Sequence, residues 1–422
     1  MARQIDDRRR EIHGERCTFM RNGAHRRLMG VVAALALFMF SGSAVLAGGG
    51  HGHRPEQLRL INGDGFGNPN NVGVGRVHAA QGYLFVGTWN DVEGMIVYRS
   101  RDGETFEQIS QGGVDGNPNN FVSVSFAWFH GRLYASSWNS VDGGSIFRAN
   151  ATARYGGDVV WETISTHGMG NPANQAHHGF RVFKSHLYAG TFNFDEGTEI
   201  WRTASGDVGT WMQVAPKALG DPRNTDAANM IEHGGYLYAG IETARQPLPG
   251  TRIVRTDGKL VPPYDQWRQV NIDGFGNPLN HNVIAMEVFK GHLYGATWNV
   301  FQGAEVWRAR LAPGHTKSVP FSNWEKVNEN GFGNPTIHQA ANFMVRNGST
   351  LYAVGYAAFG PGRGFVFKTS NGTTWEELTG PDWPPPRGPG SGVYWATVFN
   401  GKVYLAVHNG AGPGSLWVIE RK

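Results

Sequence analysis

The chain has 422 residues, and its 38 Lys and Arg against 34 Asp and Glu give a formal net charge of +4. Residues 1–47 contain eight Arg, two Asp and two Glu and so carry that whole excess, which excludes the evenly basic surface typical of nucleic-acid binding. The one Cys, Cys17, lies in the same segment, so a disulfide framework, a Cys-ligated metal site and a catalytic thiol are excluded for the rest of the chain.

Residues 1–47 predict a secretory signal peptide. An Arg-rich polar region to residue 27 is followed by an uncharged apolar stretch and by small residues that end at Ala47. We expect cleavage after Ala47 and export to the periplasm or the extracellular space. The apolar run is short for a membrane span, so an uncleaved anchor, the chain's only expected contact with a membrane, is the alternative. Three methionines are alternative starts: Met1, Met20 and Met29.

The next residues, 48–56, are rich in Gly and His and predict a flexible tail. The sequence His51-Gly52-His53 would suit Cu(II) or Ni(II) if the mature chain began after a cut at Gly48, because His51 would then be its third residue. A solvated tail is the expected role.

From residue 57 onward the chain repeats itself. A Gly-(Asn/Asp)-Pro tripeptide recurs with its Pro at positions 69, 118, 172, 222, 278 and 335, at spacings of 49 to 57 residues. A strand-like run follows each tripeptide, and then come runs such as Leu133–Asn139, Ile146–Arg148 and Trp161–Ile164. Their period of two and the Gly, Asn and Asp turns between them predict four β-strands in each unit.

The number of runs predicts a closed ring. The second and third runs occur seven times, whereas the fourth occurs only six times after them. The missing copy is Gln57–Asn62, which precedes the first Gly-Asn-Pro loop as Trp267–Asn271 precedes a later one. Radially arranged sheets need ring closure to hide their edges. We therefore predict an all-β fold with one domain, residues 57–422: a seven-bladed β-propeller of four-stranded antiparallel blades, closed by the N-terminal strand.

The repeats resemble those of a family of secreted bacterial propellers with G-F-G-N-P-x-N, L-Y-A-G-T-W-N and E-I-W-R motifs, and the resemblance covers about residues 57–422. Two turns, 100–106 and 369–375, also resemble shortened Asp-box turns of the sialidase superfamily. These turns are one residue short and a sialidase Arg-Ile-Pro motif is absent. The second resemblance therefore implies turn geometry or ancestry and carries no catalytic residues.

A meander in each predicted blade brings the Gly-Asn-Pro loops and the loops after the second strands to one face, the candidate functional face. Gly, Asn and Pro suit tight turns, and the Asn two residues after the Pro is expected to bond backbone at the start of the next strand. Calcium, held by Asn oxygens with Asp64, Asp115 or Asp273, is the alternative for these loops. Recurrence favours the structural role for these residues: Asn71, Asn120, Asn174, Asn224 and Asn280.

Aromatic-Asn pairs recur at the end of the second run, near the same face. The rings either wedge between blades or stack on a sugar, with the amides as hydrogen-bond partners of its hydroxyls. The second interpretation makes eight residues ligand-binding candidates: Trp89, Asn90, Trp138, Asn139, Phe192, Asn193, Trp298 and Asn299.

Ionisable residues that break the repeat form a second set of candidates, near the mouth of a predicted central channel. Convergence of such groups is typical of a ligand pocket, and a water-filled channel is the alternative. His is a metal ligand or a base, and no ordered motif decides between these roles. No cofactor is evident, and Ca or a His-bound transition metal is an open alternative. The candidates are His177, His178, Asp226, His281, His338, Glu287, Arg76 and Arg181.

Three functional hypotheses follow. The first, which we favour, is an exported non-catalytic binding module for a glycan or another extracellular ligand, such as a protein, on the candidate functional face. The second is a lyase or hydrolase that uses His and Glu residues of the central channel. The third is a structural scaffold, which the even repetition fits. No nucleophile elbow, phosphate loop or zinc-binding helix motif is present, and the fold alone does not choose between the three.

Overall fold

The computed structural model describes residues 56–153, 156–310, 323–336, 338–357, 363–380, 383, 391–410 and 412–421. Contacts divide the chain into a large compact unit, Leu58–Glu420, and a small one, Met1–Gln57 with Arg421–Lys422. The predicted signal peptide, its cleavage position and the His51-Gly52-His53 sequence lie outside the described residues. Among the residues that the structure describes, no helix is long and apolar enough to cross a bilayer.

The large unit consists of antiparallel sets of four strands, in which strands adjacent in sequence pair with one another, and bridges between sets join them into a 20-stranded and an 8-stranded sheet. The strands are β1 (Glu56–Asn62), β2 (Gly73–Ala80), β3 (Tyr83–Trp89), β4 (Val97–Ser100), β5 (Glu107–Gln108), β6 (Val122–Phe129), β7 (Arg132–Trp138), β8 (Ile146–Ala149), β9 (Trp161–Ser165), β10 (Ala176–Phe183), β11 (His186–Phe192), β12 (Ile200–Thr203), β13 (Met212–Gln213), β14 (Asn224–His233), β15 (Tyr236–Thr243), β16 (Arg252–Thr256), β17 (Arg268–Gln269), β18 (Asn282–Phe289), β19 (His292–Trp298), β20 (Val306–Arg310), β21 (Glu325–Lys326), β22 (Ala340–Asn347), β23 (Thr350–Tyr356), β24 (Gly364–Thr369), β25 (Glu376–Glu377), β26 (Gly392–Phe399), β27 (Lys402–His408) and β28 (Ser415–Arg421).

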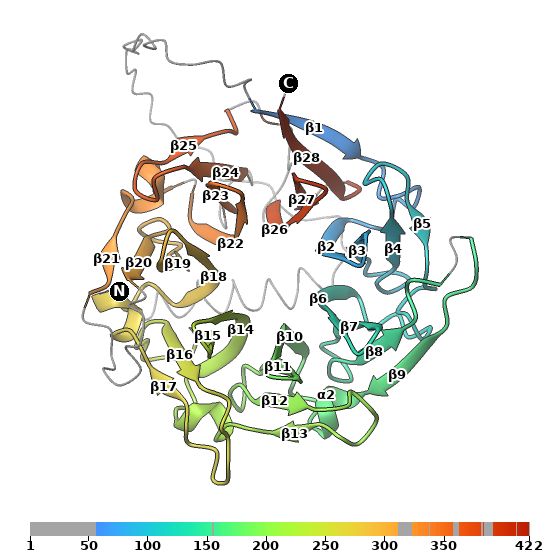
Figure 1. Ribbon diagram of the computed structural model, residues 1–422, viewed down its shortest axis with the longest axis horizontal. Helices are drawn as coiled ribbons and strands as arrows, with labels where there is room; N and C mark the ends of the chain where they lie inside the picture. Colours follow the sequence, from blue (N-terminus) through green and yellow to red (C-terminus); the bar gives the residue numbers. More distant parts are fainter. Residues whose placement is uncertain are drawn as a thin grey trace, which may run out of the picture. The chain divides into compact units, whose positions relative to one another are not determined.

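The sheets of this unit follow one another around a common centre (Figure 1). The first strand of each set, from β2 and β6 to β22 and β26, is innermost, and the short fourth strands are outermost. Single bridges join the end of a second strand to the start of the next sheet: Trp89 with Val122, Trp138 with Ala176, Phe192 with Asp226, and Trp298 with Ala340. His408 bridges Gly73, and β28 pairs with β1, so the last strands lie beside the first.

The core lies between neighbouring sheets. In one cluster Tyr188 from β11 packs with Ala227 and Val254 from the following sheet. Four of the Trp residues of the fourth runs tie the sheets together in the same way, because the Nε1 of these four donates to a carbonyl of the preceding sheet at 2.6–3.0 Å. The pairs are Trp161 with Ile109, Trp267 with Val214, Trp324 with Val270, and Trp375 with Val327.

Short helical turns introduce several of the Gly-(Asn/Asp)-Pro loops. They are α2 (His167–Gly170), η1 (Lys217–Gly220), η2 (Asp273–Gly276) and η3 (Asn330–Gly333). The two middle residues of η2, Gly274 and Phe275, have left-handed φ values of 59° and 57°. Phe275 is held in this uncommon conformation by tertiary packing, because its ring stacks on Trp307 of the following sheet with centroids 5.1 Å apart.

Candidate functional site

In five of the six loops, the Asn two residues after the Pro stabilises its own loop. Its Nδ2 donates to a carbonyl six or seven residues earlier, at 2.8–3.3 Å. The sequence suggested bonds forward to the next strand, whereas the bonds run backward because the closed loop brings that earlier carbonyl to the side chain. The pairs are Asn71 with Gly65, Asn120 with Gly113, Asn174 with Gly168, Asn224 with Ala218, and Asn280 with Gly274.

The Asn residues at the ends of the second strands are buried and bonded to these loops. Each Nδ2 donates to Oδ1 of a loop Asn at 2.8–3.2 Å, and each Oδ1 accepts from the N–H three residues later at 2.8–2.9 Å. The amide pairs are Asn90 with Asn71, Asn139 with Asn120, Asn193 with Asn174, and Asn299 with Asn280. These amides therefore link the two loops of the candidate functional face to each other.

The rings beside these amides pack between neighbouring sheets, and Trp89, Trp138, Phe192 and Trp298 are only 2–5% exposed. Centroids of Trp138 and Phe192 lie 4.8 Å apart, those of Trp298 and Tyr356 5.8 Å apart, and those of Trp89 and His408 4.2 Å apart. This packing is the wedging alternative of the sequence analysis. We call the rings at the ends of the second strands the aromatic row: Trp89, Trp138, Phe192, Trp298, Tyr356 and His408.

The carboxylates considered for calcium are bonded to protein groups. Asp64 accepts from Asn62 and Gly67, Asp115 from Asn117 and Asn120, and Asp273 from Arg252 and Gln269. In the part of the chain that the structure describes, no three His, Cys, Asp or Glu residues are grouped so that they could hold a metal ion.

Three of the four candidate histidines lie apart from one another. Nε2 of His177 lies 3.1 Å from the Gly144 carbonyl, and burial lowers the pKa of His177 to about 4. Nδ1 of His338 lies 2.8 Å from the Gly331 carbonyl in another sheet, and burial also lowers its pKa. His281 packs against the ring of Trp298. A site built on these three imidazoles together is therefore not formed.

The fourth, His178 on β10, meets Asp226 on β14. Nδ1 of His178 lies 2.8 Å from Oδ2 and 3.0 Å from Oδ1 of Asp226, and the two side chains are 10% and 2% exposed. Because a carboxylate only accepts, Nδ1 is the imidazole nitrogen that carries the hydrogen of this bond. The Trp138 ring stands edge-on to this imidazole at 5.6 Å. The pair thus joins two neighbouring sheets beside the aromatic row.

Glu242 on β15 is a candidate that the sequence analysis missed. It is the Cα partner of Asp226, and cross-strand partners point to one face with Cβ atoms about 5 Å apart. Two carboxylates therefore stand side by side, 0% and 1% exposed as residues. The signal was available, because Leu237–Thr243 aligns with Leu187–Asn193 and sets Glu242 at a position of the aromatic row.

Asn282, the first residue of β18, lies on the other side of Glu242. The N–H of Thr243 donates to the carbonyl of His281, the residue before Asn282, at 2.8 Å. In the preceding sheet the N–H of Asn193 donates to the carbonyl of Thr225, the residue before Asp226, and there Asp226 bridges Phe192. By this equivalence Asn282 stands opposite Glu242 across the boundary between two sheets.

The Asn282 side chain is a buried amide without a protein partner. The residue is 1% exposed, and neither Oδ1 nor Nδ2 has a hydrogen-bond partner among the described residues. Buried amides are almost always bonded, so this one is a candidate for contact with a ligand. We call this group the axial cluster: His178, Asp226, Glu242 and Asn282.

The remaining candidates, Arg76, Arg181 and Glu287, lie further along their first strands. Burial raises the pKa of the Glu287 carboxyl, and the charge of Arg181 opposes this shift. Burial first, and then the charges of Arg76 and Arg181, lower the pKa of His78 to about 3. These residues form a second polar group between the inner strands.

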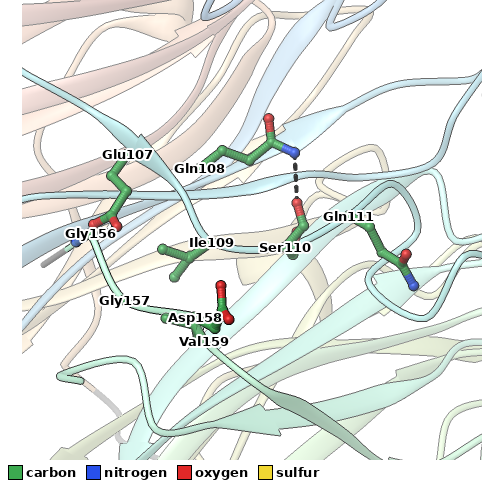
Figure 2. A pocket seen from close by; sticks show the side chains of 9 residues that line it. All are labelled: Glu107, Gln108, Ile109, Ser110, Gln111, Gly156, Gly157, Asp158 and Val159. Atoms are coloured by element: carbon green, nitrogen blue, oxygen red, sulfur yellow. Dashed lines mark hydrogen bonds between the residues drawn. The ribbon is translucent and has the colours of Figure 1, made fainter. Parts of the chain in front are cut away.

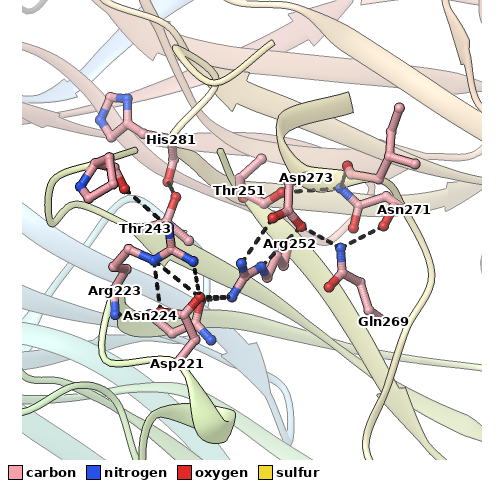
Figure 3. Close-up of polar contacts among 12 residues, drawn as sticks. Asp221, Arg223, Asn224, Thr243, Thr251, Arg252, Gln269, Asn271, Asp273 and His281 are labelled. Carbon is pink, nitrogen blue, oxygen red and sulfur yellow. Dashed lines mark hydrogen bonds and ion pairs between the residues drawn. The ribbon is translucent and has the colours of Figure 1, made fainter. Parts of the chain in front are cut away.

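The loops of the sheet β14–β17 also deviate from the repeat (Figure 3). Asp221 stands where other loops have Asn, and its Oδ2 accepts from Arg223 at 2.6 Å and from Arg252 at 2.8 Å. Arg252 also donates to Asp273 at 2.9 Å. Hydrogen bonds from Arg223 first, against burial, lower the pKa of the Asp221 carboxyl. This ion-pair network fixes the loops on either side of the strands that carry Asp226 and Glu242.

A polar pocket of about 550 Å³ lies at the outer side of another sheet, between β5 and residues 156–159 (Figure 2). The Glu107 carboxylate in its wall accepts from Arg99 at 2.8 Å and from the Gly156 N–H at 2.7 Å. This carboxylate is therefore already paired, and the pocket contains none of the residues that the sequence analysis selected.

No family model matches the chain, and no curated protein matches it. Solved structures do. The WD40 β-propeller domain of Doa1 has a TM-score of 0.51 at 10% identity, with 87% of this chain and 98% of that chain covered. The Cps50 (Swd1) β-propeller domain of Myceliophteria thermophila has a TM-score of 0.51 at 11% identity, with 87% and 100% covered. An ancestral GH74 enzyme has a TM-score of 0.50 at 12% identity, with 82% and 47% covered.

At these identities the likeness concerns the fold alone. The chain is a β-propeller protein, as its repeats predicted. Because propellers among these neighbours include both WD40 domains and an enzyme, the comparison does not choose between binding and catalysis.

Proposed function

We propose that the protein is an exported, non-catalytic binding module, built as a seven-bladed propeller that its N-terminal strand closes. The consecutive four-stranded sets from β2–β5 to β22–β25 support the blade arrangement, and β1 pairs with β28 beyond β26 and β27. Arg59 on β1 supports the closure, since its Nε donates to Glu420 at 2.8 Å and its Nη1 to Glu104 at 3.0 Å. The predicted signal peptide supports export.

We further propose that the axial cluster binds a carbohydrate. The observation that carries this proposal is the Asn282 amide, which is buried without a partner among the described residues, beside two adjacent carboxylates. An unpaired buried amide costs about 1–3 kcal/mol. That cost is relieved when a ligand with several hydroxyl groups bonds the amide, and the neighbouring carboxylates are acceptors for its other hydroxyls.

The surroundings of the cluster suit a sugar ring. Carboxylate and amide groups side by side accept from and donate to vicinal hydroxyls, and aromatic rings contact the apolar face of a pyranose. Here the Trp138 ring contacts His178, and Trp298 is the Cα partner of Asn282, so aromatic residues border the axial cluster. Asn90, Asn139, Asn193 and Asn299 are not needed in this site, because their amides hold the loops.

A glycan array with purified mature protein tests the proposal. Glu242→Gln and Asn282→Ala should each lose at least tenfold in affinity for the glycans that the wild type binds. Glu162→Gln on the outer strand β9 is the control and should bind as the wild type does. Variants that melt like the wild type but bind unchanged, or a wild type that binds no glycan, would contradict the proposal.

A second candidate function is acid–base catalysis by a lyase or hydrolase, and the His178–Asp226 pair favours it. Asp226 fixes the tautomer of His178, which leaves Nε2 as the nitrogen that can take a proton from a bound substrate. Incubation of wild-type protein with each bound glycan, followed by mass spectrometry, tests for products. Product formation that His178→Asn abolishes while binding persists would establish the enzyme; intact glycans would leave the binding module.

A further inference from the structure

Arg76 on β2 is a buried cation without a carboxylate partner. The residue is 7% exposed, and none of the ion pairs among the described residues includes it. Its Nη1 donates to the Val124 carbonyl at 3.2 Å, and its guanidinium carbon lies 3.2 Å from the centroid of the Trp395 ring. Nε is buried and has no acceptor among the described residues. Most of the five N–H donors of this guanidinium are therefore unused by the residues that the structure describes.

The bond to the Val124 carbonyl does not explain why the side chain is charged. Asn229 occupies the equivalent register in β14, since it pairs with Gly240 as Arg76 pairs with Gly87. Its neutral amide makes the same kind of link, from Nδ2 to the Ile284 carbonyl at 2.7 Å. An amide is therefore sufficient to tie neighbouring first strands, and the guanidinium adds a positive charge that this link does not require.

Other charged groups act on the same region. Arg181 on β10 donates Nε to the Met230 carbonyl at 2.9 Å and is likewise absent from the ion pairs of the described residues. Burial first, and then the charges of both guanidinium groups, lower the pKa of His78. The charges of Glu287 and Glu232 raise the pKa of Arg181 against its burial, and the charge of Arg181, after burial, lowers the pKa of Arg76.

Arg76 is therefore a buried cation of this region whose charge no ion pair among the described residues offsets. A buried guanidinium that has a like charge nearby and no counter-ion is costly, because charges in protein interiors are normally paired. A planar fork of N–H donors matches the oxygens of a carboxylate, sulfate or phosphate, and charge-assisted bonds of this kind are the strong ones.

We propose that Arg76, assisted by Arg181, binds an oxyanion between the inner strands of the propeller. The anion is either a free inorganic ion or the acidic group of a larger ligand, and both present the same oxygens to the guanidinium. This site uses residues outside the axial cluster and does not depend on the carbohydrate proposal.

Thermal melting and calorimetric titration at constant ionic strength test the site. Sodium sulfate, sodium phosphate and sodium glucuronate are the probes, and sodium chloride and neutral glucose are the blanks. We expect the wild type to be stabilised by at least one oxyanion and by neither blank. Stronger binding of glucuronate than of sulfate would assign the site to an organic acid, and equal binding to a free ion. No response to any oxyanion would overturn the proposal.

Two variants and a chemical probe separate this effect from folding. Arg76→Gln keeps a donor for the Val124 carbonyl and should bind the anion at least tenfold more weakly, whereas Arg148→Gln, at a surface guanidinium paired with Glu162 and Asp207, should respond as the wild type does. If Arg76→Gln does not fold, phenylglyoxal modification of the wild type, read by mass spectrometry, decides. The bound anion should protect Arg76; equal modification with and without it would overturn the proposal.

Discussion

Gly103 lies in an Asp-box-like turn where the first and last sheets of the unit meet. Its φ is +79°, and a Cβ at this position would run into the hydroxyl oxygen of Tyr404 on β27. Gly206 and Gly372 meet Tyr134 and Tyr294 in the same way, so the contact is a recurrent link between sheets. The glycine is needed both for its backbone conformation and for close approach.

We predict that Gly103→Ala destabilises the protein by about 2–4 kcal/mol, from left-handed strain plus overpacking. Gly67→Ala is the matched control, because Gly67 has the same φ of +79° and a Cβ added there would have nothing within 4 Å. It should cost only about 1 kcal/mol. Urea unfolding of both variants measures the difference, and equal losses would show that the contact with Tyr404 is unimportant.

His177 is predicted to make the protein less stable in acid. Burial lowers its folded pKa to about 4, whereas the unfolded chain has the ordinary value of about 6.5. Below pH 6.5 the unfolded state therefore binds the extra proton, and stability falls by about 1.4 kcal/mol per pH unit until pH 4.

Replacement by Gln keeps a donor for the Gly144 carbonyl and removes this titration. The loss of unfolding free energy between pH 7 and pH 5 should shrink by about 2 kcal/mol in His177→Gln. Urea unfolding at the two pH values measures it. A variant that loses as much stability as the wild type would mean that His177 titrates normally in the folded protein.

At the residue scale, repetition predicted the structural residues better than the functional ones. The loop and strand-end Asn residues were recognised because they recur, and their bonds also recur. Glu242 was not among the candidates because its run, Leu237–Thr243, lacks the aromatic-Asn pair, although this deviation itself carries the information. Nothing in the sequence marks Asn282, because whether its amide finds a hydrogen-bond partner depends on how β15 and β18 lie side by side.

The loops of the candidate functional face are predicted to depend on their buried Asn. Asn280 donates to Gly274 at 3.0 Å and to Glu305 at 2.7 Å, and it accepts from Thr297 and Asn299. Asn280→Ala leaves several of these buried groups unpaired and should cost about 3–5 kcal/mol. Thermal or urea unfolding measures this loss.

Asn277 in the same loop provides the control. It is half-buried, donates to Gln302 at 2.8 Å and caps the Leu279 N–H. Asn277→Ala should cost about 1 kcal/mol or less, because water can replace these bonds. If the two Ala variants were equally stable, the Asn link between the loops would not be what holds this face together.

At the element scale, the sequence predicted the strands well and the long-range polar contacts poorly. Period-two runs and Gly, Asn or Asp turns mark each strand, and β-strands formed where they were expected. The backward direction of the loop Asn bonds was not predicted, because it depends on the left-handed turn at residues such as Gly274 and Phe275. A non-Gly residue in that conformation has no reliable signature in a single sequence.

The whole molecule is predicted to need its first strand. Removal of residues 56–62 would leave the edge of β28 unpaired and delete the bond from Arg59 to Glu420. An exposed edge with a three-stranded last set favours aggregation and loss of cooperative unfolding. Calorimetry and light scattering on the mature chain, on a chain without residues 48–55 and on a chain without residues 48–62 measure this. A cooperative transition at the wild-type temperature in the shortest chain would refute closure by the N-terminal strand.

At this scale the repeats predicted the β-propeller fold, while the closed ring of seven blades, to which the count of runs and the early position of one fourth strand point, stays a prediction. The sequence predicted the centre of the ring less well. The histidines His177, His281 and His338 fall near one another in the alignment, yet each packs against a different neighbour. Adjacent residues on a strand point to opposite faces, so alignment alone does not determine which side chains meet.

Hydrogen–deuterium exchange with a glycan selected on the array tests most directly whether the axial cluster is the ligand site. We predict that bound glycan slows exchange in peptides covering 224–230, 238–243 and 281–286, which carry Asp226, Glu242 and Asn282. Peptides covering 107–111 and 156–159, at the outer pocket, should exchange at the same rate with and without the glycan. Protection confined to the outer pocket, or to the loops far from the inner strands, would contradict the account.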